Sequence, residues 1–495
     1  MLHDIDWHAR ASAVALPNRP FIDGRYVDSL SGETFACVYP GDGRLLTDVA
    51  SCNERDVDRA VQSARAAFES GVWSRMNPAD RRRILLRFAE LILQNREELA
   101  LLETLNVGKP IANAYNGDVV SAANCIAWYA EAIDKVYGEV AATAHDMTTL
   151  VLREPLGVVA AVVPWNYPMS MAAWKLGPAL ATGNSVILKP AEQSPFTALK
   201  FGELAIEAGM PAGVLNVVPG LGHIAGKALG LHMDVDCIGF TGSTEVGKYF
   251  MQYSGSSNIK RIGLELGGKS PQIVLADCDD LDAAAAGIAA GIFANTGQVC
   301  NAGSRLIVDE AVRDSLLDRI AAQALNFAPG DPLDTSTRMG SMVSQEQMER
   351  VLGYIDAGQR DGAKALIGGG RVRNETGGFY VAPTIFDGVR NDMTIAREEI
   401  FGPVLSVISV RGLDEAMTVA NDTVYGLAGA VWTGSLRNAH RAAKAMRAGV
   451  VWVNCFDRGS LAVPFGGFKQ SGFGRDKSLH AMDKYTDLKA VWFAH

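Results

Sequence analysis

The sequence predicts an α/β protein built from two doubly wound sheets with a small β extension. Short runs rich in Val, Ile and Ala alternate with helical stretches from about residue 150, and the alternation repeats from about residue 270. These runs end in Gly, Pro or Asn and are apolar throughout, which is typical of parallel strands buried on both faces. The segments 136–154 and 484–495 stand outside both series and are expected to form strands that pair elsewhere.

Size and net charge limit the classes of protein to which the chain can belong. A chain of 495 residues has material for about two or three domains. Hydrophobic residues make up 48% and charged residues 20%, as in soluble globular proteins. A net charge of −9 without a basic stripe argues against a nucleic-acid or anionic-membrane partner. No apolar run reaches the length of about 18 residues that a membrane span needs.

The cysteines and the N-terminal residues indicate the cellular compartment in which the protein is expected. The seven cysteines are scattered and include no C-x-x-C pair, so we expect neither a disulfide framework nor a metal site. The opening residues carry acids early and lack a long apolar core, unlike a signal peptide. A reducing cytoplasm fits both observations.

The first half of the chain predicts helices followed by strands. Residues 54–107 have helical spacing, and the first helix is expected to stop at Gly71. A later helix is expected to use Ser194 as its cap and Pro195 in its first turn, and to stop near Gly209. Strands are expected in "GVVAAVVPWNYP", "NSVILKP", "GVLNVVPG" and "VDCIGFTGS".

The second half predicts another α/β series. Strands are expected in "PQIVLAD", "SRLIVDE", "PVLSVISV" and "GVVWVN", with helices over 281–296, 310–326 and 436–448.

Two of the predicted strands end in polar groups suited to chemistry. In "VVPWNYP", Asn166 follows a strand, where its amide could stabilise a developing oxyanion. The alternative is that it only caps a turn. In "LKPAEQSP", Glu192 could accept hydrogen bonds from ribose hydroxyls beside Lys189. The alternative is a solvated ion pair.

A glycine-containing turn follows the next strand. In "FTGSTEVGK", Gly242 and Ser243 stand at the apparent start of a helix, whose N–H groups would face a phosphate. The spacing is not the usual G-x-G-x-x-G, and close backbone packing explains the glycines equally well.

A carboxylate and a thiol complete the set. In "GLELGGKSP", Glu265 next to two glycines suits a mobile general base, or else a surface glutamate. In "ANTGQVCNAGSR", Cys300 lies in a short turn rather than inside an apolar run. This placement favours a nucleophile, although most cysteines are inert packing.

These stretches together resemble the aldehyde dehydrogenase superfamily. "PWNYP", "FTGSTEVG", "ELGGKSP", "GQVCNAGSR", "EEIFGPV" and "PFGGFKQSGFGRD" occur in the order and spacing of that family, and the resemblance runs from about residue 20 to the end. It implies that Cys300 is the nucleophile, Glu265 the general base and Asn166 part of the oxyanion hole. Lys175 matches a proton-relay lysine, whose usual glutamate partner is replaced by Asp476.

The resemblance also implies a dinucleotide cofactor and a domain plan. NAD is expected because the Glu192 carboxylate would repel a 2′-phosphate, with NADP use possible through Lys189. The implied cofactor residues are Trp165, Lys189, Glu192, Gly242, Ser243, Glu399 and Phe401. The implied domains are a Rossmann-like NAD-binding domain (1–135 and 155–267), a catalytic domain (268–475) and an oligomerisation segment (136–154 and 476–495) of a homodimer or homotetramer.

The implied chemistry is oxidation of an aldehyde to a carboxylate through a cysteine thiohemiacetal and thioester. Coenzyme A-acylating relatives usually lack the glutamate, so Glu265 favours hydrolysis. A non-catalytic NAD-binding scaffold is the alternative of another class. Such proteins often lose one of the three catalytic groups, which are all present here.

The substrate is inferred from the expected pocket and from the C-terminal residues. The tail "GRDKSLHAMDKYTDLKAVW" is similar to that of bacterial γ-glutamyl-γ-aminobutyraldehyde and guanidinobutyraldehyde dehydrogenases of polyamine breakdown, which include putrescine degradation. An ω-amino, guanidino or γ-glutamylamino aldehyde is therefore expected, the alternative being a broad-range enzyme. Gly459, where an aromatic residue is common, implies a wide tunnel. The expected substrate residues are Asp118, Tyr167, Trp174, Asp457 and Phe465.

Overall fold

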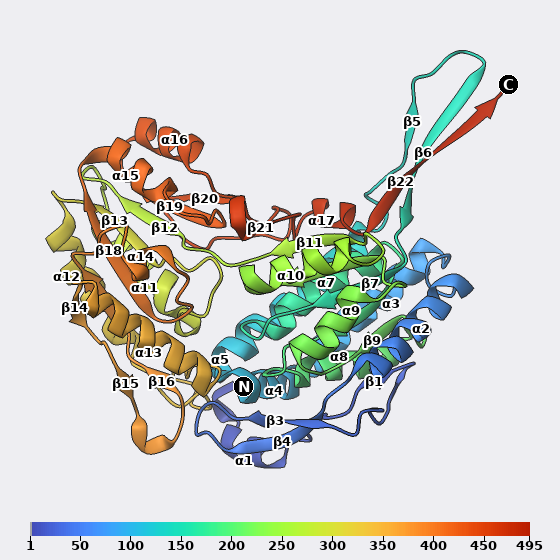
Figure 1. Cartoon of the computed structure of the whole chain (residues 1–495), viewed down its shortest axis with the longest axis horizontal. Helices are drawn as coiled ribbons and strands as arrows, with labels where there is room; N and C mark the ends of the chain where they lie inside the picture. The colour runs from blue at the N-terminus through green and yellow to red at the C-terminus, as the bar shows by residue number, and fades with distance from the viewer. Residues whose placement is uncertain (1) are drawn as a thin grey trace.

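The first sheet forms from strands that are apolar at nearly every position, so that both of its faces can be covered. In the computed structural model, which describes residues 2–495, eight strands lie in the order β2-β1-β9-β8-β7-β10-β11-β21 (Figure 1). The five from β9 to β11 run parallel. The strands are β1 (Phe21–Ile22), β2 (Arg25–Tyr26), β7 (Val158–Val162), β8 (Ser185–Lys189), β9 (Leu215–Val217), β10 (Cys237–Thr241), β11 (Arg261–Glu265) and β21 (Gly472–Phe473).

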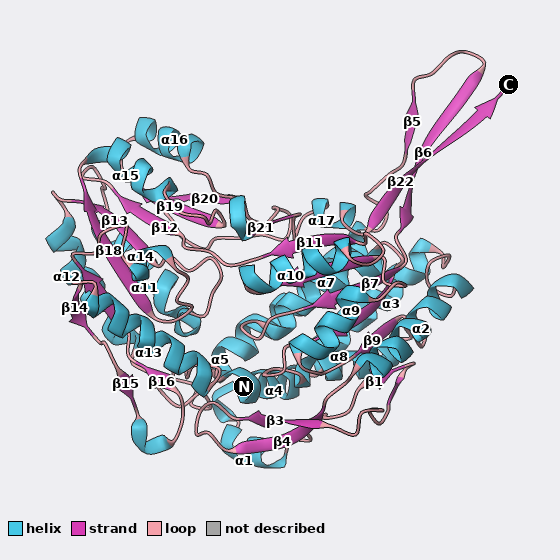
Figure 2. Ribbon diagram, viewed as in Figure 1, coloured by secondary structure: helices cyan, strands magenta, loops and turns pink. Residues whose placement is uncertain are grey.

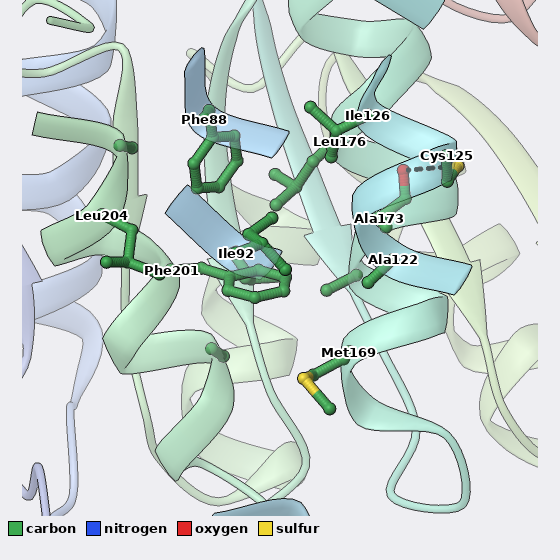
Figure 3. Packing of buried hydrophobic residues seen from close by; sticks show 14 of the residues in the cluster. Phe88, Ile92, Ala122, Cys125, Ile126, Met169, Ala173, Leu176, Phe201 and Leu204 are labelled. Atoms are coloured by element: carbon green, nitrogen blue, oxygen red, sulfur yellow. Dashed lines mark hydrogen bonds between the residues drawn. The ribbon is translucent and has the colours of Figure 1, made fainter. Parts of the chain in front are cut away.

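Helices cover both faces of this sheet. Val159 and Ala161 of β7 belong to one hydrophobic cluster, and Val158 and Ala160 belong to another on the opposite face. Figure 3 shows the first cluster, where side chains from α3, α6, α7 and α8 interlock. The helices are α2 (Glu54–Ser70), α3 (Pro78–Gln94), α4 (Arg96–Val107), α5 (Ile111–Asn113), α6 (Val119–Ala132), α7 (Pro168–Ala181), α8 (Phe196–Glu207), α9 (Lys227–Leu231) and α10 (Thr244–Gly255).

The ends of the helices show which boundaries the local sequence predicts correctly and which it does not. Helix α2 ends as predicted, with Gly71 in the left-handed conformation. The prediction that Ser194 caps α8 is wrong, because its hydroxyl makes no cap bond and Pro195 is the N-cap residue. The free N–H of Phe196 is satisfied instead by Oδ1 of Asn106, 3.0 Å away on α4.

The second sheet repeats the same architecture. Seven strands lie in the order β14-β17-β18-β13-β12-β19-β20, and all pairs are parallel except the edge pair β14–β17. The strands are β12 (Pro271–Val274), β13 (Arg305–Asp309), β14 (Lys364–Ile367), β17 (Thr384–Asp387), β18 (Val404–Val410), β19 (Ala428–Trp432) and β20 (Val450–Val453). The helices are α11 (Leu281–Phe293), α12 (Arg313–Ala324), α13 (Gln345–Arg360), α14 (Thr394–Arg397), α15 (Gly412–Asn421) and α16 (Leu436–Ala445).

The two α/β series predicted from the sequence are thus confirmed as a doubly wound fold with a separate β extension (Figure 2). The sequence did not predict β14, β17, β19, α13 or α15, nor the smaller elements. The unpredicted elements also include α6 in the first half of the chain, α1 (Trp7–Ala13), α17 (His480–Asp483), and the hairpin strands β3 (Thr34–Val38), β4 (Leu45–Ala50), β15 (Arg371–Val372) and β16 (Tyr380–Val381). Strand β21, which lies within the predicted catalytic segment, pairs with β11 in the first sheet.

A three-stranded arm projects from the body of the molecule (Figure 1). It contains β5 (Glu139–Ala141), β6 (Met147–Pro155) and β22 (Thr486–Ala494), and β22 pairs with β6 along its whole length. Large apolar side chains stand exposed on it, with Val140 at 74% and Trp492 at 61%. An exposed apolar sheet of this kind is suited to contact with another protein surface.

Across residues 2–495, no helix has both the length and the hydrophobicity required to cross a bilayer.

Arg305 links the second sheet to the segment that enters it from the first. Its guanidinium is fully buried at the start of β13. It donates hydrogen bonds to the carbonyl oxygens of Lys269 at 3.1 Å, Val419 at 3.1 Å and Ala420 at 2.9 Å. A buried charge that satisfies three carbonyl groups is costly to remove, because each orphaned carbonyl loses its partner.

We expect Arg305→Leu to lower the free energy of unfolding by about 3 kcal/mol or more, because buried carbonyls are left unpaired. Arg319→Leu is the matched control, since Arg319 pairs with the exposed Asp282 at 2.7 Å and should change stability by less than about 0.5 kcal/mol. Urea and thermal unfolding of both variants measure the difference. Equal losses in the two variants would contradict the role of Arg305.

Candidate active site

Parallel pairing brings the predicted functional stretches of the first domain to one edge. Strands β8, β7, β10 and β11 are adjacent, and their last residues lie in register. Lys189 pairs with Val162, Val162 with Phe240, and Thr241 with Glu265. The chain leaves β7 toward β8 on one side and β10 toward β11 on the other, so β7 and β10 flank a topological switch point. Ligands of open α/β sheets bind at such a point.

The loop that carries Cys300 approaches this edge from the second sheet. Residues 266–270 lead from the end of β11 to the start of β12, and Cys300 precedes β13, the neighbour of β12. A Cβ atom on Gly268 would lie 2.4 Å from the carbonyl oxygen of Cys300. Only glycine allows this approach, which holds the thiol loop against the segment that follows Glu265.

Two amide side chains, those of Asn166 and Asn295, fix the Cys300 loop. Asn166 donates from Nδ2 to the carbonyl oxygen of Gln298 at 2.9 Å, and Asn295 donates to the same oxygen at 3.2 Å. Asn295 and Thr296 have positive φ angles of 48° and 57°. Non-glycine residues adopt this strained backbone where the surroundings enforce it. The second N–H of the Asn166 amide remains free to donate. Asn295 and Gln298 were not predicted, although both lie in the stretch that contains Cys300.

The Cys300 thiol is half-buried and is protonated at neutral pH in this state. Burial is the largest cause that raises its pKa, to about 12, and the carboxylates of Glu399, Glu265 and Asp457 add to the effect. A hydrogen bond from the backbone of Asn301 acts in the opposite direction. The thiol therefore needs a base or a changed environment to become a thiolate.

Glu265 is buried at the end of β11 with both carboxylate oxygens unpaired. Burial raises its pKa well above the ordinary value, as does the nearby charge of Asp476, while Lys175 and Lys484 lower it. A buried carboxyl without hydrogen bonds is neutral at rest, and it can act as a base only after a change in its surroundings lets it ionise.

Asp476 lies between two lysines at the centre of a buried cluster. Lys175 of α7 binds one carboxylate oxygen, and Lys484 binds the other. Asp476 is fully buried, and although burial itself disfavours its charge, the two lysines bring its pKa below the ordinary value. Lys484 was not predicted from the sequence, because it carries no motif and reaches the cluster only through the fold.

The residues predicted to bind the adenosine and pyrophosphate groups lie beside the switch point. Lys189 ends β8, and its buried Nζ is 3.6 Å from a carboxylate oxygen of Glu192. The backbone N–H of Gly242 donates to the carbonyl oxygen of Glu265 at 3.1 Å. Ser243 is the N-cap residue of α10 and accepts a hydrogen bond from the N–H of Val246. The first turn of α10 thus presents the positive end of a helix to this edge.

The residues predicted to contact the nicotinamide also come together. The rings of Trp165 and Phe401 meet edge to face with centroids 5.2 Å apart. Glu399 accepts a hydrogen bond from the N–H of Gly268 at 3.0 Å, and burial raises its pKa to about 7. Glu399 therefore lies beside the segment that packs on Cys300.

Of the predicted substrate residues, Trp174 and Phe465 form an aromatic pair with centroids 5.4 Å apart. Asp457 accepts a hydrogen bond from Asn301, the residue after Cys300, at 2.8 Å. Lys477, which was not predicted, places its Nζ 4.2 Å from the centre of the Trp174 ring.

Asp118 and Tyr167, the other predicted substrate residues, both contact Lys109. Asp118 is buried and binds Lys109 at 2.6 Å, so it does not present a free carboxylate to a ligand. The ammonium of Lys109 lies 3.9 Å from the centre of the Tyr167 ring. Asp118 is thus paired with a lysine that packs on the Tyr167 ring.

Comparisons with known proteins agree on one family. The model of the aldehyde dehydrogenase family matches residues 26–491. The NADP/NAD-dependent aldehyde dehydrogenase PuuC of Escherichia coli is 49% identical over 488 residues, 99% of this chain and 98% of PuuC.

Two solved structures resemble the whole chain. The γ-glutamyl-γ-aminobutyraldehyde dehydrogenase of Burkholderia cenocepacia is 57% identical with a TM-score of 0.97, covering 100% of this chain and 99% of that one. The indole-3-acetaldehyde dehydrogenase AldA of P. syringae, a mutant in complex with NAD+ and IAA, is 58% identical with a TM-score of 0.98, covering 99% of each chain.

We expect the Cys300 thiol of the cofactor-free protein to be alkylated slowly near neutral pH. Its rate should still rise between about pH 8 and 10, because the thiolate forms only as pH approaches the raised pKa. Glu399→Gln removes a negative charge and should increase the rate at a given pH. Iodoacetamide labelling read by mass spectrometry measures this, with half-buried Cys455 in the same digest as the reference. A plateau below pH 8 would contradict the expectation.

Proposed function

The chain belongs to the aldehyde dehydrogenase family, and we propose that it oxidises a nitrogen-bearing aldehyde of polyamine catabolism to the carboxylate. The proposed substrates are ω-amino, guanidino or γ-glutamylamino aldehydes, and NAD is the proposed cofactor, with NADP also accepted. The observation that carries the proposal is the convergence of Cys300, Asn166 and Glu265 where the two sheets meet. The name of the similar Burkholderia cenocepacia enzyme supports the substrate class, and the name of PuuC supports the use of both dinucleotides.

Cys300 is the proposed nucleophile. After the thiol loses its proton, the thiolate sulfur adds to the aldehyde carbon, and the carbonyl oxygen becomes an oxyanion. The free N–H of the Asn166 amide and the backbone N–H of Cys300 are the proposed donors to that oxygen. The hydrogen bond from Asn166 to Gln298 keeps the amide in place, so little reorganisation is needed as charge develops. One donor of this type contributes about 3 kcal/mol in a comparable site.

The residues at the edge of the first sheet fit a dinucleotide. The helix start at Ser243 suits a pyrophosphate, and the carboxylate of Glu192 suits ribose hydroxyls. Trp165, Phe401 and Glu399 would enclose the nicotinamide end. When bound, the nicotinamide accepts the hydride that leaves the substrate carbon, which converts the Cys300 adduct into a thioester.

Glu265 is the proposed base for hydrolysis of that thioester. Once ionised, its unpaired, buried carboxylate takes a proton from water, and the hydroxide attacks the thioester carbon. The acid and the Cys300 thiolate leave, and the proton held by Glu265 can return to the sulfur. The buried cluster of Lys175, Asp476 and Lys484 lies close enough to influence its charge. With both lysines protonated and Asp476 ionised, an ionised Glu265 makes the cluster neutral.

The alternatives differ in what they would retain. An acylating enzyme would not need Glu265, and a non-catalytic scaffold would not need the Cys300 loop held in strained backbone by Asn166 and Asn295. A dehydrogenase for neutral aromatic or mixed aldehydes is the second candidate within the family. The Trp174–Phe465 pair and the similarity to an indole-3-acetaldehyde dehydrogenase favour it.

Assembly and location complete the proposal. The exposed apolar arm of β5, β6 and β22 is the proposed contact between subunits of a homodimer or homotetramer. The free, scattered cysteines support a cytoplasmic location.

The test of the substrate class is NADH formation with an ω-amino aldehyde, a γ-glutamylamino aldehyde and a neutral aldehyde of similar length. We expect kcat/KM to favour a nitrogen-bearing substrate by about tenfold or more, equivalent to about 1.4 kcal/mol of transition-state discrimination. Indole-3-acetaldehyde serves as the aromatic comparison. Equal values for all substrates would establish a broad-range enzyme, and no NADH or NADPH with any of them would contradict the dehydrogenase itself.

The cluster around Asp476 predicts opposite pH shifts in two variants. Lys484→Met removes a positive charge, raises the pKa of Glu265 further and should move the rise of carboxylate release to higher pH by about one unit. Asp476→Asn removes a negative charge and should move it to lower pH. Rapid-quench measurement of acid release from the acyl-enzyme between about pH 6 and 10 checks both. Shifts in the same direction would show that the cluster acts on folding rather than on Glu265.

A further inference from the structure

Lys477 brings a positive charge to the aromatic pair expected in the substrate pocket. It directly follows Asp476, and its Nζ lies 4.2 Å from the centre of the Trp174 ring and 5.3 Å from that of Phe465. One face of the Trp174 ring, to which a cation is attracted, is therefore occupied by a lysine of the protein itself.

The Lys477 ammonium has no polar partner among residues 2–495. No hydrogen bond reaches its Nζ, and no carboxylate oxygen lies within 4.0 Å of it. Half-burial lowers its pKa, and Asp457 is the charge that counteracts this most. Lysine ammonium groups carry three donors, so all three remain available to a ligand.

The backbone at Lys477 has the left-handed conformation, which is unfavourable for a lysine. Lys477 and Ser478 have φ angles of 58° and 51°, and strained residues of this kind cost about 1–3 kcal/mol each. Two hydrogen bonds maintain the strain, from the N–H of Ser478 to Leu461 at 2.6 Å and from the hydroxyl of Tyr129 to the carbonyl oxygen of Ser478 at 3.1 Å.

The space beside the ammonium is kept open by a missing side chain. A Cβ atom on Gly459 would lie 3.4 Å from Nζ of Lys477, so any longer side chain at position 459 would crowd the charge. Asp457, two residues earlier, also has a positive φ of 53° and supplies the opposite charge. A cation and an anion are thus both held near the aromatic pair.

We propose that Lys477 binds a carboxylate at the far end of the aldehyde substrate, and that the pocket selects an amino-acid head group. A carboxylate would satisfy the unpaired ammonium through charge-assisted hydrogen bonds. A free ω-ammonium or guanidinium would meet a like charge over Trp174. Asp457 would suit the α-ammonium of the same head group. The inference rests on the proposed function and narrows it to γ-glutamylamino aldehydes.

The experiment compares kcat/KM for three substrates: a γ-glutamylamino aldehyde, its analogue with the α-carboxylate replaced by a carboxamide, and a neutral aldehyde of similar length. We expect the native enzyme to prefer the carboxylate over the carboxamide by about tenfold or more. Lys477→Met should reduce this ratio to about one, mainly through KM of the carboxylate substrate, and Lys477→Arg should restore most of it.

Lys444→Met is the matched control, because Lys444 is an exposed lysine on α16 whose loss should leave the ratio unchanged. An unchanged ratio in Lys477→Met would overturn the proposal. Loss of activity toward all three aldehydes in both Lys477 variants would indicate a structural role and would overturn it as well. If the native enzyme oxidises the neutral aldehyde but does not prefer the carboxylate substrate, the proposed dehydrogenase activity stands and the proposed selection of the head group is wrong. Native enzyme inactive with all three rejects the dehydrogenase itself.

Discussion

The register of four parallel strands is the constraint on which the rest of the structure depends. Parallel pairing places the ends of β8, β7, β10 and β11 side by side, so that Lys189, Val162, Thr241 and Glu265 all lie at one edge of the sheet. Groups that are far apart in the sequence are thereby assembled without any long-range signal of their own. A shift of one residue in any pair would turn the last side chain of that strand to the opposite face of the sheet. The apolar residues that alternate between the two buried faces oppose such a shift, because it would expose or crowd an entire strand.

The contact between the two sheets depends on close packing of the segment that connects them. Residues 266–270 pass from one sheet to the other, and Gly268 touches the Cys300 carbonyl so closely that no side chain is tolerated. Arg305 holds the carbonyl of Lys269 from below this segment. The site is consequently built on strand ends rather than on long free loops, which suits chemistry that needs fixed donors. Two buried carboxyl groups in the same region differ in their partners. Glu265 has no hydrogen-bond partner among the described residues, whereas Asp476 accepts hydrogen bonds from two lysines.

The sequence predicted the elements and residues whose signals are local. Apolar runs that end in glycine or proline gave the central strands, and the stretches around Glu265 and Cys300 gave the candidate chemistry because their residues are contiguous. It could not predict Lys484, which reaches Asp476 only after the C-terminal segment packs on α7. It also misjudged the start of α8, where a distant asparagine replaces the local cap. Asp118 was expected among the substrate groups, but whether a carboxylate is free or paired depends on its three-dimensional neighbours, here Lys109.

The C-terminal segment has a consequence for how the enzyme is made. Residues 476–495 supply Asp476 and Lys484 to the buried cluster and β22 to the arm. Strand β22 pairs with β6, whose residues are translated more than 300 positions earlier. Domains begin to fold from the N-terminus during synthesis, so the strands of the first sheet that precede β21 can form while these residues are still inside the ribosome. The cluster around Asp476 is then completed only after residues 476–495 have emerged. A nascent chain therefore carries the Cys300 thiol before the cluster around Asp476 exists, and this cluster and the arm are completed in the same late step.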